Sequence, residues 1–486
     1  MLSNLEIALF YTRSLIHSGN NALILFAQGY YSVSDNLVFL PLGGTGEIGM
    51  NLNLYGFGER WLMVDCGVTF EKPANRVSLR PSIQMADPQF VVSRRQMLEG
   101  LIITHAHEDH LGAVPYLWDQ LKCPIYTTPF TASVLQQKYR SRGKPLPGEL
   151  IHALPGSQRR IGEFDVQWLH LTHSTPETCA LHIQVGGHSV LHTADWKSDA
   201  NPVVGPAWAP SAWKNLLRVG VDAVVCDSTN ALKPGRSATE GEVAEGLLQT
   251  ISPLTGKVVI ACFASNIARM QSILRLAHAC GRRVGLLGRS LENMYRNALA
   301  NSLLEPEFRP IDARHLEYLP AYEVLALATG SQGEPGAALY QLGRDSHRHL
   351  SVGEGDTVIF SAKTIPGNEE AVARSVALLR DRGVQVIHAD DSDRVLHASG
   401  HPCQDDLRDL YDVLQPKVVI PVHGEPEHMK ANARVARSAG VQQALTGQNG
   451  DLFYLAPVPG VHKRWASVGR LEWLENEERL QTVADI

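Results

Sequence analysis

The first half of the chain alternates short apolar runs with turns, a pattern that predicts two sheets packed face to face. Residues 37–40 and 61–64 form two such runs, and the run 100–104 leads directly into a polar loop. Short strands and turns with occasional helices continue to about residue 235. We therefore expect a sheet-on-sheet core flanked by helices in this part of the chain.

The pattern changes at about residue 236, where apolar runs begin to alternate with segments of helical spacing. Residues 267–279 and 369–380 carry apolar positions three or four apart and predict helices. Alternating strands and helices form a parallel, doubly wound sheet, so we predict a separate α/β domain over 236–392. The strands expected in it are 257–263, 283–287, 324–328, 357–360 and 384–387.

A polar loop after the run 100–104 concentrates side chains that bind metals. Its residues are His105, His107, Asp109 and His110, and the apolar residues 111–118 that follow predict a helix. A solvent-exposed loop is the better interpretation for any lone histidine, but four ligand-type side chains in six residues favour a metal site. His105 and His107 can reach one ion, while Asp109 and His110, past the bend, can reach a second.

This loop resembles the signature His-x-His-x-Asp-His of the metallo-β-lactamase superfamily, whose remaining pattern follows in order. Asp65, His173, Asp195 and His423 each follow an apolar run, so each is expected at a strand end where loops meet. The resemblance implies an αββα sandwich and two metals, with Asp65 orienting a ligand from behind. The implied ligands are His105, His107 and His173 for one metal, Asp109, His110 and His423 for the other, and Asp195 as the bridge.

The predicted insertion narrows the resemblance to the β-CASP nucleases, and within them to bacterial ribonuclease J. Residues 226–230 (Cys-Asp-Ser-Thr-Asn) resemble the first added acidic motif of that group, and 397–401 (His-Ala-Ser-Gly-His) resemble its third. The resemblance implies hydrolysis of phosphodiester bonds with two divalent metals, zinc by default and manganese compatible with the same ligands. The implied catalytic residues are Asp109, Asp195 and His401, with Asp227 behind them.

The substrate implied by the resemblance is RNA, because histidine in the third motif goes with RNA in this group and an apolar residue there goes with DNA. It further implies 5′-to-3′ degradation with a preference for a 5′-monophosphate, with endonuclease activity left open. The alternatives are a DNA nuclease of the same fold, a thioesterase-like hydrolase, which needs no second lobe, and a non-catalytic RNA-binding scaffold. A complete ligand set disfavours the scaffold, because buried imidazoles without metal would be poorly satisfied.

Small polar residues follow three strands of the predicted insertion, at the edge where such sheets bind ligands. N-capping explains any one of them. Three together, with the glycine-rich turn 329–335, favour phosphate binding, and residue 399 extends the set. The predicted phosphate- and RNA-binding residues are Ser265, Asn266, Ser331, Gln332, Ser361, Lys363, Ser399 and His401.

A second glycine-rich loop, 43–49, mimics a dinucleotide-binding fingerprint through Gly44, Gly46 and Gly49. The alternating residues 50–55 that follow predict a strand, whereas a true fingerprint opens a helix. We therefore expect this loop to lie near the floor of the metal site rather than to bind a nucleotide cofactor.

The composition of the 486-residue chain adds a little to what the motifs indicate about the compartment and the binding partners. Seven scattered cysteines without a Cys-x-x-Cys pair indicate a reducing compartment and argue against sulfur-ligated metal. With neither a long apolar run nor the features of a signal peptide, we expect a cytoplasmic protein without a membrane partner. The net charge of −6 counts mildly against a nucleic-acid binder, although a few well-placed cations can bind a phosphate backbone.

Homo-oligomerisation is left open. The chain is predicted to divide into five parts. The parts are an N-terminal extension (1–36), a first part of the metallo-β-lactamase domain (37–235), the β-CASP domain (236–392), a second part of the metallo-β-lactamase domain (393–456) and a short C-terminal tail (457–486).

Overall fold

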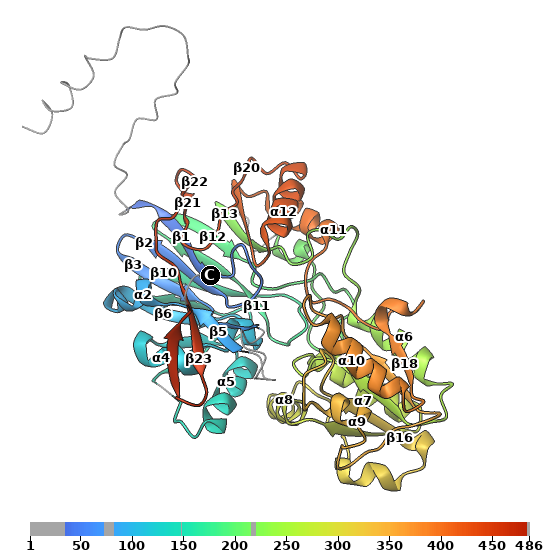
Figure 1. The fold of residues 1–486 in the computed structure, drawn as a ribbon. Helices are drawn as coiled ribbons and strands as arrows, with labels where there is room; N and C mark the ends of the chain where they lie inside the picture. The colour runs from blue at the N-terminus through green and yellow to red at the C-terminus, as the bar shows by residue number, and fades with distance from the viewer. Residues whose placement is uncertain (1–34, 72–81, 147, 215–219, 484–486) are drawn as a thin grey trace, which may run out of the picture. The chain divides into compact units, whose positions relative to one another are not determined.

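The computed structural model describes residues 35–71, 82–146, 148–214 and 220–483. The predicted N-terminal extension therefore lies outside the described residues, apart from its last two. Within the described ranges, two large mixed sheets, a five-stranded sheet and a four-stranded sheet account for the strands. Figure 1 shows these strands together with the helices that pack on them.

The two large sheets carry most of the strands predicted for the first half of the chain. In order across the sheet, the eight-stranded one holds β22 (Gly460–His462), β21 (Leu452–Ala456), β1 (Leu37–Gly43), β2 (Leu52–Phe57), β3 (Arg60–Val64), β6 (Leu98–Ile103), β7 (Ile125–Thr127) and β8 (Leu150–His152). The seven-stranded one holds β20 (Gln443–Ala444), β19 (Val418–Val422), β13 (Ala223–Asp227), β12 (His188–His192), β11 (Cys179–Val185), β10 (Phe164–His170) and β9 (Gln158–Ile161).

These sheets pack face to face because successive side chains of a strand point to opposite faces. Leu37 and Phe39 of β1 pack with Trp168 and Ile183 of the other sheet in one buried cluster. Val38, the residue between them, belongs instead to the cluster under the outer helices. The inner faces thus form one apolar core, and each sheet keeps a second apolar face for helices.

Helices cover both outer faces, which completes the αββα sandwich expected from the resemblance. α4 (Val114–Leu121) and α5 (Pro129–Ser141) pack on the eight-stranded sheet, and α11 (Gln404–Leu414) and α12 (Pro426–Ser438) pack on the seven-stranded one. No helix in the described ranges is long and apolar enough to cross a bilayer. The short helical segments are α2 (Gln89–Val92), α3 (Glu108–Leu111), η2 (Arg95–Met97), η3 (Pro210–Trp213), η4 (Ala313–Tyr318), η5 (Ala321–Glu323) and η6 (Ala389–Asp391).

The five-stranded sheet is the doubly wound sheet predicted for the insertion, and all of its strands run parallel. Side chains of α6 and α7 pack on one face of β14 and side chains of α9 and α10 on the other. In order across the sheet, its strands are β15 (Arg283–Leu287), β16 (Val324–Ala328), β14 (Val258–Ala261), β17 (Thr357–Phe360) and β18 (Gln385–His388). Its helices are α6 (Glu240–Ile251), α7 (Ile267–Ala279), α8 (Arg289–Ala300), α9 (Ala338–Gly343) and α10 (Glu369–Arg380).

The expected fold class is therefore confirmed, and α7 and α10 begin and end at the predicted residues. The four-stranded sheet was not predicted. It pairs β4 (Val68–Glu71) and β5 (Ser82–Ala86) with β23 (Arg470–Leu474) and β24 (Arg479–Thr482) in the order β24-β23-β5-β4. Residues assigned to a short C-terminal tail thus extend a sheet that begins early in the chain, and Figure 1 shows β23 beside β5.

The packing of the sandwich core predicts how strongly substitutions in β11 should lower stability, because buried Ile183 adjoins exposed Gln184. Ile183→Ala should lower the free energy of unfolding by about 2–5 kcal/mol and Ile183→Val by about 0.5–1.5 kcal/mol, because each removes apolar volume from a closed core. Gln184→Ala, the matched control, should change it by less than about 0.5 kcal/mol. Urea unfolding measures all three, and equal losses at 183 and 184 would contradict the packing described.

Candidate metal centre

The predicted ligands lie on loops that leave neighbouring strands at one edge of the sandwich. Asp65 directly follows β3, His105 lies two residues beyond β6, and His423 directly follows β19. Asp65 (φ 65°), His423 (φ 49°) and Ala194 (φ 52°), the residue before Asp195, adopt the left-handed region that L residues rarely occupy. Such strain persists where surrounding structure imposes it, and it clusters at functional sites.

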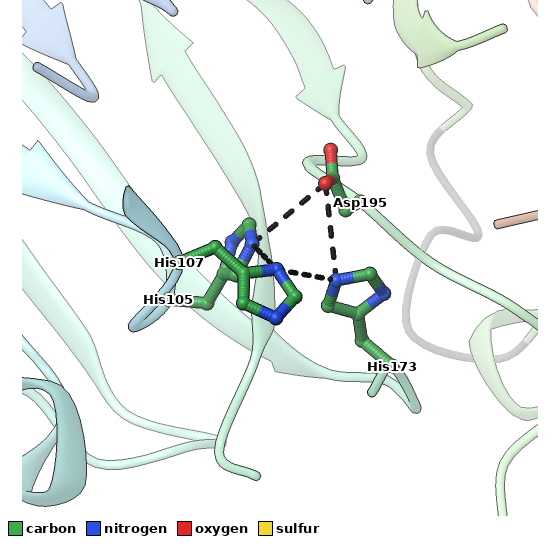
Figure 2. A group of neighbouring side chains, drawn as sticks. All are labelled: His105, His107, His173 and Asp195. Carbon is green, nitrogen blue, oxygen red and sulfur yellow. Dashed lines mark hydrogen bonds and ion pairs between the residues drawn. The ribbon is translucent and has the colours of Figure 1, made fainter. Parts of the chain in front are cut away.

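Four of the predicted residues form a first group of ligand atoms, drawn in Figure 2. His107 Nδ1 lies 3.1 Å from His105 Nε2 and 3.1 Å from His173 Nε2. Asp195 Oδ2 lies 3.7 Å from His105 Nε2 and 3.8 Å from His173 Nε2. All four atoms lie within 4.8 Å of one another. Three imidazole nitrogens and one carboxylate oxygen form a donor set that suits a divalent transition metal.

A second group shares Asp195 with the first and adds Asp109, His110 and His423. His110 Nε2 lies 3.2 Å from Asp195 Oδ2 and 3.5 Å from Asp109 Oδ2. His423 Nε2 lies 3.1 Å from Asp109 Oδ2. The loop His105–His110 therefore supplies atoms to both groups, and the Asp195 carboxylate lies between them.

Hydrogen-bond acceptors fix which ring nitrogen of three histidines faces the groups. His110 Nδ1 lies 2.7 Å from Asp65 Oδ2, and His173 Nδ1 lies 2.6 Å from the carbonyl oxygen of Gly400. Because both partners only accept, each Nδ1 carries a proton, and each Nε2 is the nitrogen that faces the group and can give its lone pair to a bound cation. His105 Nδ1 lies 3.0 Å from the Thr104 hydroxyl, which itself bonds to the Asp65 carboxylate.

Gly400 approaches His173 so closely that no other residue fits. A Cβ at this position would lie 2.6 Å from His173 Cε1, inside any permitted contact. The glycine of the motif 397–401 therefore lets the backbone carbonyl reach the imidazole and hold it. This contact explains chemically why a glycine precedes His401.

Burial and mutual charges set the protonation of the cluster. Burial lowers the pKa of His107 to about 4. Burial raises the pKa of Asp195, but the charges of His423 and His110 outweigh it and hold this pKa well below its usual value. Burial lowers the pKa of His423, but the charge of Asp195 and hydrogen bonds to Asp109 and Asp227 outweigh burial and raise this pKa to about 10. Protons on His110 and His423 therefore balance the carboxylates, and a bound cation would displace those on the coordinating nitrogens.

His401 lies at the edge of these groups rather than inside them. Its Nδ1 lies 2.8 Å from Asp227 Oδ2 and 3.9 Å from Asp195 Oδ2. Burial lowers the pKa of His401, but the charges of Asp227 and Asp195 outweigh burial and raise it. Asp227 also accepts hydrogen bonds from the backbone N–H and hydroxyl of Thr229, each 2.8 Å away. The motifs 226–230 and 397–401, far apart in sequence, thus meet beside the ligand groups.

Several side chains that hold the site were missed by sequence reasoning. Thr104 connects Asp65 to His105, and Thr229 Oγ1 lies 3.0 Å from His423 Nδ1. Asn51, buried at the end of the loop 43–49, places Nδ2 3.1 Å from His110 Nε2 and 3.1 Å from the carbonyl oxygen of Asp109. Adjacency was the available signal for Thr104, which precedes His105, and for Thr229, which lies within the motif 226–230. Asn51 lies two residues after the loop 43–49, which was expected near the floor of the site.

The structure separates the predicted phosphate-binding residues into two kinds. The Asn266 side chain caps α7 by accepting from Arg269 N at 2.8 Å, which is the N-capping alternative. The Ser361 hydroxyl is buried, donates to Leu396 O at 2.7 Å and accepts from Arg269 Nη1 at 2.5 Å. These two side chains stabilise the fold. The prediction that Asn266 and Ser361 bind phosphate is therefore corrected.

Other predicted residues lie near the ligand groups or on loops of the insertion. The Ser399 hydroxyl accepts from Asn230 Nδ2 at 2.8 Å and so adjoins His401. Gln332 bonds through Nε2 to the carbonyl of Lys363 at 3.0 Å, which ties together the loops that carry Ser331 and Lys363. Ser265 is half-buried at the end of β14.

Lys233, which no motif suggested, adds a cation beside this network. Its Nζ lies 2.5 Å from Asn230 Oδ1. Burial lowers the pKa of Lys233, and the charge of Lys363 lowers it further. Two ammonium groups thus face the same region beside the loop of Ser399.

Comparison with protein families gives a match for each part of this architecture. A family model described as the metallo-beta-lactamase superfamily matches residues 51–217. The model described as ribonuclease J, beta-CASP domain, matches residues 255–379, and the one described as Zn-dependent metallo-hydrolase RNA specificity domain matches residues 377–444.

Relatives and one solved structure match most of the chain. Ribonuclease J of Sinorhizobium meliloti is 40% identical over 433 residues, which cover 87% of this chain and 75% of the relative. Ribonuclease J of Mycolicibacterium smegmatis is 36% identical over 84% of this chain and 73% of the relative. The crystal structure of a protein of unknown function from Enterococcus faecalis, at 14% identity and a TM-score of 0.61, covers 86% of this chain and 99% of its own and shares the fold.

These matches confirm the resemblance drawn from the metal-binding loop and the two added motifs. The chain belongs to the ribonuclease J family, whose metal-dependent ribonucleases combine the metallo-β-lactamase and β-CASP domains.

Proposed function

We propose that the protein is a hydrolase that degrades RNA from its 5′ end, prefers a 5′-monophosphate and uses two divalent metals, zinc by default. The observation that carries the proposal is the pair of ligand groups joined by Asp195, with His401 at their edge. The cytoplasmic location, the homo-oligomer and internal cleavage stay predictions.

The donor set fits two ions. His105, His107 and His173 would hold one, Asp109, His110 and His423 the other, and the Asp195 carboxylate would contact both. When bound, the metals supply a water of lowered pKa and neutralise charge that develops on the phosphate. Asp65 and the Gly400 carbonyl keep the imidazoles turned toward the place where an ion would bind.

His401 is positioned to give a proton to the leaving oxygen. Asp227 accepts from Nδ1, which leaves Nε2 of the protonated ring free to donate. The neighbouring carboxylates favour the protonated form, as a general acid requires. Asp227 is then a positioning residue, because it acts on the substrate only through His401.

The 5′ end would lie on the side of His401 that faces the insertion. Ser399, Asn230 and Lys233 form a hydrogen-bonded chain there, and Lys363 adds a second ammonium group. Two cations near hydroxyl and amide donors suit a terminal phosphate. A phosphate held there would place the first phosphodiester bond at the metals.

The two-metal arrangement predicts that Asp195→Ala loses metal and activity together, because both groups lose a shared ligand. Elemental analysis of the unaltered protein should find close to two ions per chain. Glu108→Ala is the matched control from the same loop, since Glu108 pairs with Lys138 at 2.7 Å and belongs to neither group. A fully active Asp195→Ala variant would overturn the bridging role.

The acid role predicts that His401→Ala lowers kcat by roughly 10²–10⁴-fold while metal content stays unchanged. The exposed His315 of the insertion offers a control, and His315→Ala should leave both unchanged. Because His401 also forms a ligand-distance group with Asp195, Asp227 and His423, loss of metal in His401→Ala would make it a ligand instead.

The end preference predicts a rate order on one RNA carrying three different 5′ ends. A 5′-hydroxyl should be degraded roughly tenfold to a hundredfold more slowly than a 5′-monophosphate, because it leaves buried donors unpaired. A 5′-triphosphate should also be slower, because it is too bulky for a pocket of this kind. Ser399→Ala should reduce the preference, whereas Ser346→Ala, at an exposed turn, should not. Equal rates on all three ends would reject the pocket and favour an endonuclease.

A further inference from the structure

A groove of about 930 Å³ opens on the metallo-β-lactamase domain, outside the ligand groups. It lies between the glycine-rich loop 44–47, the start of α12 and residues 446–470. We call it the basic groove, and the lining residues that matter are Thr45, Lys430, Asn449, Lys463, Arg464 and Arg470. None of them belongs to the predicted site.

The two carboxylates of the groove are already neutralised. Glu47 pairs with Arg470 and accepts from Asn449 Nδ2 at 2.5 Å. Asp451 pairs with Lys463 at 2.9 Å and accepts from the backbone N–H of Arg464 at 2.7 Å. The Lys430 ammonium and the Arg464 guanidinium are exposed and have no acidic partner in the part of the chain that the structure describes. The groove therefore keeps two unpaired positive charges.

A buried hydroxyl in the groove also lacks a partner. Thr45 is 2% exposed, and its Oγ1 makes no hydrogen bond within the described residues. Its backbone N–H donates to Asn449 Oδ1 at 2.9 Å, which holds the residue in place. The hydroxyl is enclosed behind the groove wall, so the exposed cations rather than Thr45 would meet a ligand.

The basic groove adjoins the part of the chain that carries His423. Asp227 lies between His401 and His423, and the backbone N–H of His423 donates to the carbonyl of Gly44 at 2.7 Å. Gly44 directly precedes Thr45, and Pro426 at the groove wall lies three residues after His423. A strand whose 5′ end lies beside His401 would therefore leave the metals toward this groove.

The chemistry of the lining distinguishes among ligands. Few apolar side chains line the groove. Met429 and Val468 lie beside threonine, glutamine and asparagine, so the groove offers little apolar surface to an apolar ligand or to a protein helix. Two free cations on an open polar wall suit the repeated phosphates of a single strand.

We propose that the basic groove binds backbone phosphates of the RNA on the 3′ side of the scissile bond. The inference rests on the proposed function for the identity and direction of the strand. Lys430 and Arg464 contact phosphates. These contacts increase the residence of long RNA between successive cleavages and leave the chemical step unchanged.

The test compares a 30-nucleotide and a tetranucleotide RNA, both with a 5′-monophosphate, on the double variant Lys430→Ala/Arg464→Ala. KM for the long RNA should rise roughly tenfold with kcat unchanged, because two phosphate contacts are lost. The dependence of log KM on log salt should weaken by about 1.4, at about 0.7 for each contact to a single strand. Kinetics of the tetranucleotide, too short to fill the groove, should not change.

Arg348→Ala is the matched control. Arg348 is exposed and lies before β17, at the amino-terminal ends of the inserted strands, whereas the predicted phosphate loops follow their carboxyl ends.

An unchanged KM for long RNA, or equal changes for both lengths, would overturn the groove as an RNA site and leave the proposed function standing. If inorganic phosphate instead altered the tetranucleotide rate through Lys430 and Arg464, the ligand would be a free anion and the RNA assignment would fail. Absence of RNA hydrolysis by the unaltered, metal-loaded protein would reject the proposed function itself.

Discussion

The carboxylate of Asp195 is the contact on which the rest of the site depends. It lies within 4 Å of ring nitrogens of His105, His110, His173, His423 and His401. Burying that many imidazoles and carboxylates costs free energy unless opposite charges or a metal satisfy them. Opposite charges provide part of that compensation, because Asp195 and hydrogen bonds to Asp109 and Asp227 raise the pKa of His423, whereas burial lowers the pKa of His107. The cluster is compatible with a divalent metal.

Such a cluster stays together only because the sandwich fixes the ends of its strands. The shared core between the two sheets sets their spacing, and the left-handed residues Asp65 and His423 turn the chain inward as soon as each strand ends. Because Gly400 has no side chain, the segment that follows the inserted domain can approach His173 closely, and the Gly400 carbonyl accepts a hydrogen bond from the His173 ring. His173, a candidate metal ligand, is thus oriented by the motif that follows the inserted domain.

The sequence predicted those features that short stretches encode by themselves. Helical spacing defined α7 and α10, and the loop 105–110 supplies two of the four residues in each ligand group. The four-stranded sheet escaped prediction because its pairing joins strands of four or five residues almost 400 positions apart, and strands this short carry too little periodicity to be recognised. Ser361 was misinterpreted for a related reason. Its hydroxyl is held by Arg269, whose buried pairing with Glu240 spans two helices and has no signature in either.

Net charge proved a poor guide to where an anionic polymer can bind, because local pairing decides which charges are available. The formal charge of −6 includes carboxylates that are already satisfied, such as Asp451 in the basic groove and Asp195 among the imidazoles. Lys430 and Arg464 stand without acidic partners in the described part of the chain, and the charge of Lys363 acts on the partly buried ammonium group of Lys233, whose pKa it lowers. Electrostatic attraction of a phosphate falls off within about 8–10 Å at physiological salt, so an RNA strand responds to these local surpluses rather than to the total. Two cationic surfaces near a metal centre can therefore position a strand across it in a protein that is acidic as a whole.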